Sequence, residues 1–356
     1  MNSATVTSGL PVLLWPGKRV QPTRWLAWIL PAASLLLAGC AEGENVRGAP
    51  SIIHPRGLAA GRIDDLWWIM FWLGSAVFLI VMGALLVALF HRRREPVDEQ
   101  ATAERGKKAI LWGGIILPAI ILLVVFGFTV GTLRAMSMPE TDENTIIEVI
   151  GHRWWWEVHY TDHQFFTANE IHIPVGQPVQ IKLTSQDVIH SFWVPQLHGK
   201  MDMNPGKTNT FWIRADEAGE YWGECAEFCG VQHAKMQFVV VAELPEEFEA
   251  WLEQQRQPAA EPVDELAQQG KQIFLSSDCI NCHTIEGTNA TGALGPDLTH
   301  LASRRTLGAG AIENTIGSLG GWVVDSHSIK PGNLMPETDI DGPELHALLA
   351  YLVSLK

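Results

Sequence analysis

GECAEFCGVQHAKM, residues 223–236, is the stretch that decides the fold of this chain, because it gathers metal-binding side chains in one short loop. Cys225 and Cys229 are four positions apart and can place both thiolates on the same metal pair. His233 and Met236 add an imidazole and a thioether, and this mixture of donors is selective for copper. The segment therefore predicts a copper site.

A second imidazole is still needed, and His190 in DVIHSFWVP, residues 187–195, can supply it from a loop at the end of a strand. Copper sites in cupredoxin folds take one histidine from an early loop and their other ligands from a late one. A tetrahedral zinc site with two cysteines and two histidines is the alternative. The thioether of Met236 and the short cysteine spacing argue against zinc and favour copper.

The sequence around these ligands has the pattern of a β-domain. From Ile146 to about Ala242, apolar and polar residues alternate in short runs such as TIIEVI (145–150), VQIKL (179–183) and QFVVV (237–241). Proline and glycine separate the runs. This alternation predicts a β-sandwich or barrel of about 100 residues.

A second metal-binding motif, CINCH at residues 279–283, lies downstream. Two thiols at this spacing can each add to a vinyl group of haem, and His283 is then the proximal iron ligand. Half of a zinc knuckle or a redox dithiol is the alternative. Met335 is the natural sixth ligand, because it is the only methionine after the motif and because Met/His ligation suits electron transfer. The rival ligands are His300, His327 and His346.

Residues 263–356 resemble class I cytochrome c domains. The resemblance implies an all-α fold, and it identifies Gly342–Leu355 as the amphipathic C-terminal helix of that family. The preceding segment, 243–262, is rich in Glu, Gln, Pro and Ala. It predicts a short helix over 246–255 followed by a mobile linker.

Two uncharged apolar stretches, 66–90 and 109–133, are each long enough to cross a bilayer as a helix. The loop between them, 91–108, holds six Lys or Arg residues and is therefore expected in the cytoplasm. This hairpin places the later domains, 134–242 and 263–356, on the extracytoplasmic side of a bacterial plasma membrane.

The N-terminus has the pattern of a lipoprotein signal peptide. A short apolar run, Trp25–Gly39, follows basic residues and ends at LAGC, residues 37–40. Cleavage would remove residues 1–39 and leave a lipid on Cys40, followed by an extracytoplasmic segment over 40–65. An uncleaved third helix is the alternative, which the length of the run disfavours.

Taken together, the loop at 223–236, HSFWVP (190–195) and GHRWWW (151–156) resemble subunit II of haem-copper cytochrome c oxidases, of the type with a fused cytochrome c. The resemblance implies a binuclear copper centre, CuA, bound by the side chains of His190, Cys225, Cys229, His233 and Met236. Glu227 would bind through its backbone carbonyl, and its carboxylate would face a magnesium ion shared with subunit I. Trp154 matches the position where electrons reach the copper domain.

Core packing of a β-domain is the alternative explanation for the aromatic triplet Trp154–Trp156, in which strand alternation would set Trp155 apart. The proton-uptake carboxylate of the family has no match here, because Leu111 stands at its position and Glu104 is the nearest acid.

The charge is unevenly distributed. The net charge is −14, and residues 134–356 alone carry 31 acidic and 13 basic residues. This acidic surface either keeps the chain soluble or steers a basic electron donor, and both explanations stay open. No nucleic-acid partner is expected.

We therefore expect an electron-transfer subunit that receives electrons from a cytochrome c or similar donor. Electrons would pass from haem c to CuA and on to subunit I, where oxygen is reduced to water with proton translocation. The electron-entry subunit of a CuA-containing nitric oxide reductase is the closest alternative. A thioredoxin-type copper chaperone is a second one, but it would need a βαβ setting with its histidine far downstream.

Overall fold

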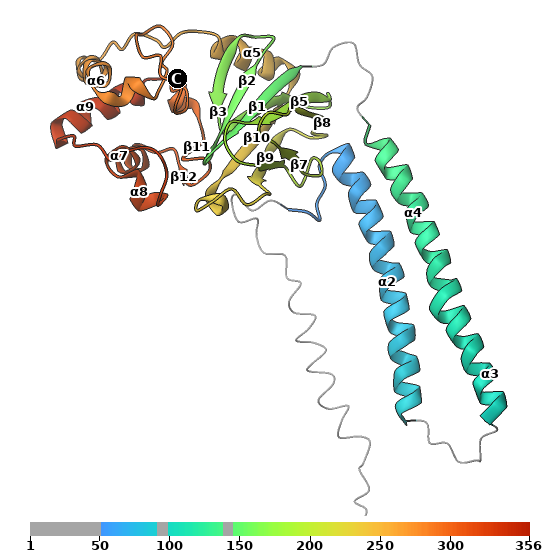
Figure 1. Ribbon diagram of the computed structural model, residues 1–356. Coiled ribbons are helices and arrows are strands. Elements are labelled where there is room, and N and C mark those ends of the chain that lie inside the picture. The colour runs from blue at the N-terminus through green and yellow to red at the C-terminus, as the bar shows by residue number, and fades with distance from the viewer. Residues whose placement is uncertain (1–50, 91–98, 138–144) are drawn as a thin grey trace, which may run out of the picture. The chain divides into compact units, whose positions relative to one another are not determined.

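The computed structural model describes residues 51–90, 99–137 and 145–356, all of which belong to one compact unit. These residues form two long apolar helices, a β-sandwich and a helical C-terminal domain (Figure 1). The predicted fold class is therefore confirmed. The predicted signal peptide and Cys40 lie outside the described residues.

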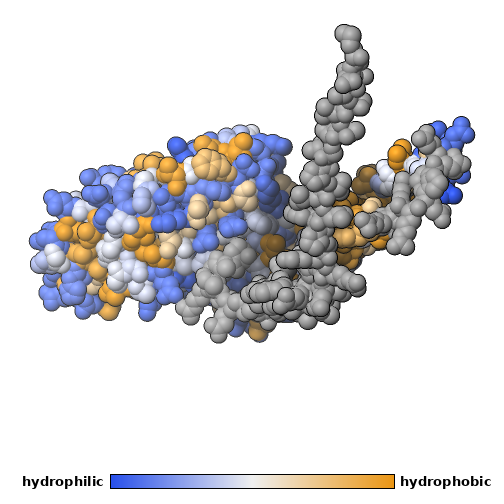
Figure 2. All heavy atoms as spheres, turned by 90° about the horizontal axis from the view of Figure 1, so that it is seen from below, coloured by the Kyte–Doolittle hydropathy of each residue, from blue (hydrophilic) through white to orange (hydrophobic). Residues whose placement is uncertain are grey.

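Both apolar helices are longer than the spans expected from the sequence. Helix α2 covers Leu58–Phe90, while the second helix continues from α3 (Glu99–Ala109) through the π-helical turn η2 (Ile110–Ile116) into α4 (Leu117–Ala135). Each is long and apolar enough to cross a membrane. Their large apolar side chains face outward, where Figure 2 shows hydrophobic atoms. Lipid is the solvent that such a surface requires.

Ten strands form the β-sandwich. One sheet has the order β3-β2-β1-β5-β8 and the other has the order β4-β10-β9-β6-β7. Within them, β1 pairs in parallel with β5, and β10 pairs in parallel with β4. The strands are β1 (Ile146–His152), β2 (Trp155–Tyr160), β3 (Phe165–Ala168), β4 (Glu170–Pro174), β5 (Val179–Ser185), β6 (His190–Trp193), β7 (Met201–Met203), β8 (Asn209–Ile213), β9 (Gly219–Cys225) and β10 (Gln237–Glu243).

The alternating sequence pattern produces the sandwich core. Along β1 and β5 every second residue is buried, as the alternation of apolar and polar side chains predicts. Three large aromatic residues fill the space between the sheets. Trp156 lies 4.9 Å from Phe238 and 6.0 Å from Phe192, measured between ring centroids.

The segment expected to be a linker is not free of the two domains. Its predicted helix is present as α5, Pro245–Gln255, and buries Phe248 and Leu252 in the sandwich core. The residues after α5 bond to the C-terminal domain: the amide of Ala259 donates to the carbonyl of Glu286 at 3.0 Å. These packing and main-chain contacts, which composition does not reveal, connect the segment to both domains.

The C-terminal domain is built on two crossing helices, α6 (Glu265–Ser276) and α9 (Gly342–Leu352). Gly270 permits their close approach, because a Cβ atom there would lie 1.9 Å from the carbonyl oxygen of Ala347. The expected C-terminal helix is confirmed, although α9 ends at Leu352. The remaining elements are η4 (Asp278–Asn281), η5 (Leu301–Ser303), β11 (Thr306–Leu307), β12 (Ile312–Glu313), α7 (Ile316–Val324) and α8 (Ser326–Ile329).

Candidate metal centres

The predicted copper ligands meet at one end of the sandwich. Strand β6 begins at His190 and pairs with β9, which ends at Cys225. The chain then turns through Cys229 into the short helix η3 (His233–Lys235) and reaches Met236 just before β10. Sheet pairing therefore brings the early histidine beside the late cysteine loop.

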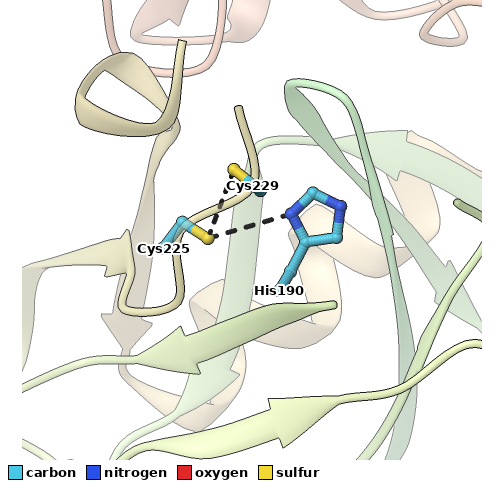
Figure 3. A group of neighbouring side chains, drawn as sticks. All are labelled: His190, Cys225 and Cys229. Carbon is cyan, nitrogen blue, oxygen red and sulfur yellow. Dashed lines mark hydrogen bonds between the residues drawn. The ribbon is translucent and has the colours of Figure 1, made fainter. Parts of the chain in front are cut away.

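The donor atoms of these five side chains form a continuous set of contacts. The sulfur atoms of Cys225 and Cys229 are 3.8 Å apart, and Sγ of Cys225 lies 3.8 Å from Nδ1 of His190 (Figure 3). Sγ of Cys229 lies 3.7 Å from Nδ1 of His233 and 3.8 Å from Sδ of Met236. Each thiol thus faces the other thiol and one imidazole, and Cys229 also faces the thioether.

A sixth donor completes the set. The carbonyl oxygen of Glu227 lies 3.2 Å from Sγ of Cys225, as expected for a backbone ligand. Two thiols, two imidazoles, a thioether and a carbonyl around one thiol pair match the ligand preferences of copper. The residues present therefore fit the binuclear copper group that the family resemblance implies.

The contact between the two thiols moves their pKa values in opposite directions. The hydrogen bond with Cys229 lowers the pKa of Cys225, and the contact with His190 lowers it further. Next to the resulting thiolate, the pKa of Cys229 is raised. One thiol of the pair is thus readily deprotonated, and a bound cation would favour loss of the second proton.

A carboxylate that the sequence analysis did not single out as a site residue holds the His190 ring. Nε2 of His190 donates to Oδ1 of Asp187 at 2.9 Å, which leaves Nδ1 facing the sulfur atoms. Burial alone would lower the pKa of His190, but its hydrogen bonds with Cys225 and Asp187 raise it. An acid bonded to the far nitrogen of a ligand histidine is a common support for metal sites. Its position three residues before His190 was the available sequence signal.

Trp154 is packed against residues 223–236, here called the copper loop. Its side chain is buried, and its indole N–H donates to the carbonyl oxygen of Cys229 at 3.0 Å. Gly230 makes room for the indole, since a Cβ atom there would lie 3.0 Å from the Trp154 ring. Trp156 is buried as well, whereas Trp155 is half-buried and stacks on His152. The expected alternation along the triplet is confirmed.

The haem motif lies between α6 and the loops that follow it. Cys279 and Cys282 are half-buried and free, and Nδ1 of His283 lies 2.7 Å from the carbonyl oxygen of Pro296. That contact makes Nδ1 the donor and leaves Nε2 available as a ligand. Burial lowers the pKa of His283, which favours the neutral ring that a metal requires. The carbonyl of Pro296 had no sequence signal.

The loop that holds Met335 is fixed by local hydrogen bonds. The amide of Met335 donates to Oδ1 of Asn333 at 2.8 Å, and its carbonyl accepts from His327 at 3.1 Å. His327 is thereby engaged, and both ring nitrogens of His300 face main-chain carbonyls. His346 is exposed on α9. His300 therefore has both ring nitrogens engaged and His327 has one, whereas the hydrogen bonds of Met335 use its main chain and leave the thioether as a possible ligand.

Exposed leucines flank the predicted haem ligands. Leu294 is 78% exposed and lies directly before Gly295, whose Cβ position is filled by the His283 ring. Leu334 is 72% exposed and directly precedes Met335. Large apolar side chains exposed beside metal ligands fit the lining of an apolar group such as haem.

The chain resembles two known families along its length. Residues 163–243 match the family described as Cytochrome C oxidase subunit II, periplasmic domain, and residues 267–356 match the family described as Cytochrome c. Together these domains imply copper and haem c as cofactors.

Three relatives named cytochrome c oxidase subunit 2 match nearly the whole chain. The one from Alkalihalophilus pseudofirmus is 37% identical over 330 residues, covering 91% of this chain and 94% of the relative. The one from Bacillus sp. strain PS3 is 32% identical, covering 91% and 95%. The one from Bacillus subtilis is 30% identical, covering 93% and 97%. The chain therefore belongs to the cytochrome c oxidase subunit II family, as a membrane-anchored electron-transfer subunit with extracytoplasmic copper and cytochrome c domains.

Proposed function

We propose that the cytochrome c domain receives electrons and the copper domain passes them to the oxygen-reducing subunit. In this assignment His190, Cys225, Cys229, His233 and Met236, with the carbonyl of Glu227, hold binuclear copper. Cys279, Cys282, His283 and Met335 hold haem c. When bound, both groups supply one-electron carriers, and the chain's residues position them and exclude water.

One observation carries the proposal most directly. Six donor atoms from two distant segments already lie within contact distance around the pair Cys225–Cys229. A site formed this completely by packing needs little rearrangement during electron transfer, which suits a centre that changes only its charge. The nitric oxide reductase alternative gains no support, since all three relatives above are named as oxidase subunits.

The proposal also includes a magnesium ion that the carboxylate of Glu227 shares with subunit I. Its carboxylate lies 3.7 Å from Nζ of Lys200, which in turn lies 3.9 Å from Asp202. Among the described residues, the group with metal-site geometry is His190 with Cys225 and Cys229, and Glu227 is not in it. Glu227 would therefore need oxygen ligands from subunit I to hold magnesium.

The membrane and donor assignments belong to the same proposal. The hairpin would cross a bacterial plasma membrane with residues 91–108 in the cytoplasm, and Cys40 would carry a lipid. Glu104 forms an ion pair with Lys107 at 2.9 Å on an exposed face, and nothing in that pair marks it as a site of proton uptake. A cytochrome c or a similar cationic protein would be the donor.

Removing residues 263–356 tests whether the cytochrome c domain relays electrons to the copper domain. The truncated subunit should still accept electrons from added cationic cytochrome c near Trp154, but slowly, because the tethered domain's high effective concentration is lost. In the intact oxidase, the rate with that donor should fall as salt rises, because exposed charges are screened beyond about 8–10 Å. Equal turnover of truncated and intact proteins at every donor concentration would refute the relay. A salt-independent rate would remove only electrostatic steering.

A further inference from the structure

A buried lysine joins the two electron-transfer domains. The side chain of Lys330, in the cytochrome c domain, is 2% exposed. Its ammonium donates to the carbonyl oxygen of Trp154 in the copper domain at 2.8 Å. It also donates to the carbonyl oxygen of Gly308 in its own domain at 2.8 Å. One side chain thus bonds the main chain on both sides of the boundary.

Packing alone does not explain why a lysine occupies this buried position. No salt bridge involves it in the part of the chain that the structure describes, although its charge is out of contact with water. Burial lowers the pKa of Lys330 to about 7, which reflects the cost of placing a charged amine there without an ion-pair partner, and an apolar side chain of similar length would avoid that cost. The two carbonyl bonds therefore indicate a role beyond stability.

The residues on either side of Lys330 also accept hydrogen bonds from the copper domain. Nζ of Lys235 in the copper loop donates to the carbonyl of Ile329 at 2.7 Å. The side chain of Gln232 in that loop donates to the carbonyl of Pro331. Three consecutive residues of the cytochrome c domain, 329–331, are thus held by the copper loop and by the residue that packs on it.

This contact lies on a short connection between the two sets of metal ligands. On one side, Asn333 donates to the carbonyl of Lys330 at 2.9 Å and accepts from the amide of Met335 at 2.8 Å. On the other side, Trp154 donates through its indole to the carbonyl of Cys229 at 3.0 Å. Hydrogen bonds and covalent bonds therefore run without a break from a proposed haem ligand to a proposed copper ligand.

We propose that Lys330 is a positioning residue for electron transfer: it fixes the Met335 loop of the cytochrome c domain against Trp154 of the copper domain. This inference rests on the proposed function, because it assumes that electrons pass between these domains. Lys330 does not touch a reacting atom. Its two bonds set the docked arrangement in which the loop and the tryptophan main chain stay in contact.

Lys330→Met tests the proposal in the purified, metal-loaded oxidase, because methionine keeps the unbranched chain but cannot donate. Lys271→Met is the matched control, since Lys271 is another largely buried lysine of the same domain. Lys271 forms an ion pair at 2.6 Å with Glu261, in the segment that precedes the domain, and does not contact the copper domain through that pair. Haem c is reduced with a photoactivated ruthenium complex, and electron arrival at copper is followed in the near infrared. Hydrogen exchange is measured at residues 328–334 and 153–156.

In Lys330→Met the haem-to-copper rate should fall about tenfold, and exchange should rise in both segments, because each loses the crossing bond. The haem potential and the copper spectrum should stay unchanged. Lys271→Met should match the wild type in every measurement. If Lys330→Met does not assemble, Lys330→Gln, which keeps a neutral donor, should show a smaller loss of the same kind.

An unchanged rate or unchanged exchange in the Lys330 variant would overturn the inference. So would a rate loss fully explained by a shifted haem potential, since Lys330 would then act on the haem alone. Absence of haem-to-copper transfer in the wild type would instead refute the proposed function. The two failures are therefore distinguishable.

Discussion

The copper site and the haem site differ in how far apart their ligands lie in the sequence. Three of the four proposed haem ligands fall within residues 279–283, while the copper ligands come from β6, the end of β9 and the loop before β10. Sheet pairing between β6 and β9 must form before His190 reaches Cys225. The copper site thus depends on the packed sandwich, whereas the haem attachment depends on a local motif.

Exchange of a proposed copper-binding cysteine should give the largest effect in this comparison. Cys225→Ser or Cys229→Ser should abolish the binuclear near-infrared and EPR signals, because a serine hydroxyl cannot replace a thiolate as a copper ligand. The helices should still insert in the membrane, and haem c should remain attached. Cys279→Ser is the reciprocal variant and should spare the copper signals. A mixed-valence copper spectrum in either copper variant would show that the ligand assignment is wrong.

Met335→Ala should give the next largest effect. The haem should stay bound, because Cys279 and Cys282 hold it covalently, but its potential should fall when the thioether is lost. A drop of about 0.1 V or more is expected, within the ~0.8 V range that axial ligands cover. Redox titration of the haem band measures it.

His346→Ala is the control for that titration, since the ring is exposed on α9 and should not influence the potential. A potential that stays constant in Met335→Ala would transfer the axial role to a histidine.

The same contrast explains how much the sequence could predict. The donors in residues 223–236 and 279–283 were identifiable because their spacing is itself the chemical requirement. Strand alternation in β1 and β5 was equally visible. The packing of α5 and the crossing bonds of Lys330 were not, because both depend on contacts between segments far apart in the chain. A lysine in a loop has no local pattern that separates a buried position from a solvated one.

Asp187→Asn should give a smaller effect that is confined to the copper site. The carboxylate accepts from Nε2 of His190 and from the backbone amide of Arg153 at 2.8 Å, so it fixes both the ring and the neighbouring turn. Loss of such a support lowers metal affinity by about 10- to 100-fold. Competition with a copper chelator measures the change.

Asp216→Asn is the matched control, because that carboxylate pairs with Arg214 on the exposed surface of the same domain. The haem potential should stay the same in both variants. An unchanged copper affinity in Asp187→Asn would mean that the sandwich alone orients His190.

The smallest predicted effect separates the acid stability of the two domains. Glu157 in β2 accepts from His152 at 2.7 Å and from His159 at 2.6 Å. Burial alone would raise its pKa, but the two histidines outweigh burial and lower the pKa to about 2. Because the folded pKa lies below the model value of 4.5, this carboxylate stabilises the fold above pH ~4.5 and loses that contribution as the pH falls toward ~2. Glu157→Gln should therefore lower the free energy of unfolding by about 1–2 kcal/mol at neutral pH, and the difference from the wild type should vanish near pH 2. Chemical denaturation across this pH range, followed by the copper band for one domain and the haem Soret band for the other, measures this difference.

Asp162→Asn, in an exposed turn, is the control and should have no effect. An equal shift of both bands in Glu157→Gln would show that the two domains unfold as one unit, which would contradict the predicted separation of their acid stabilities.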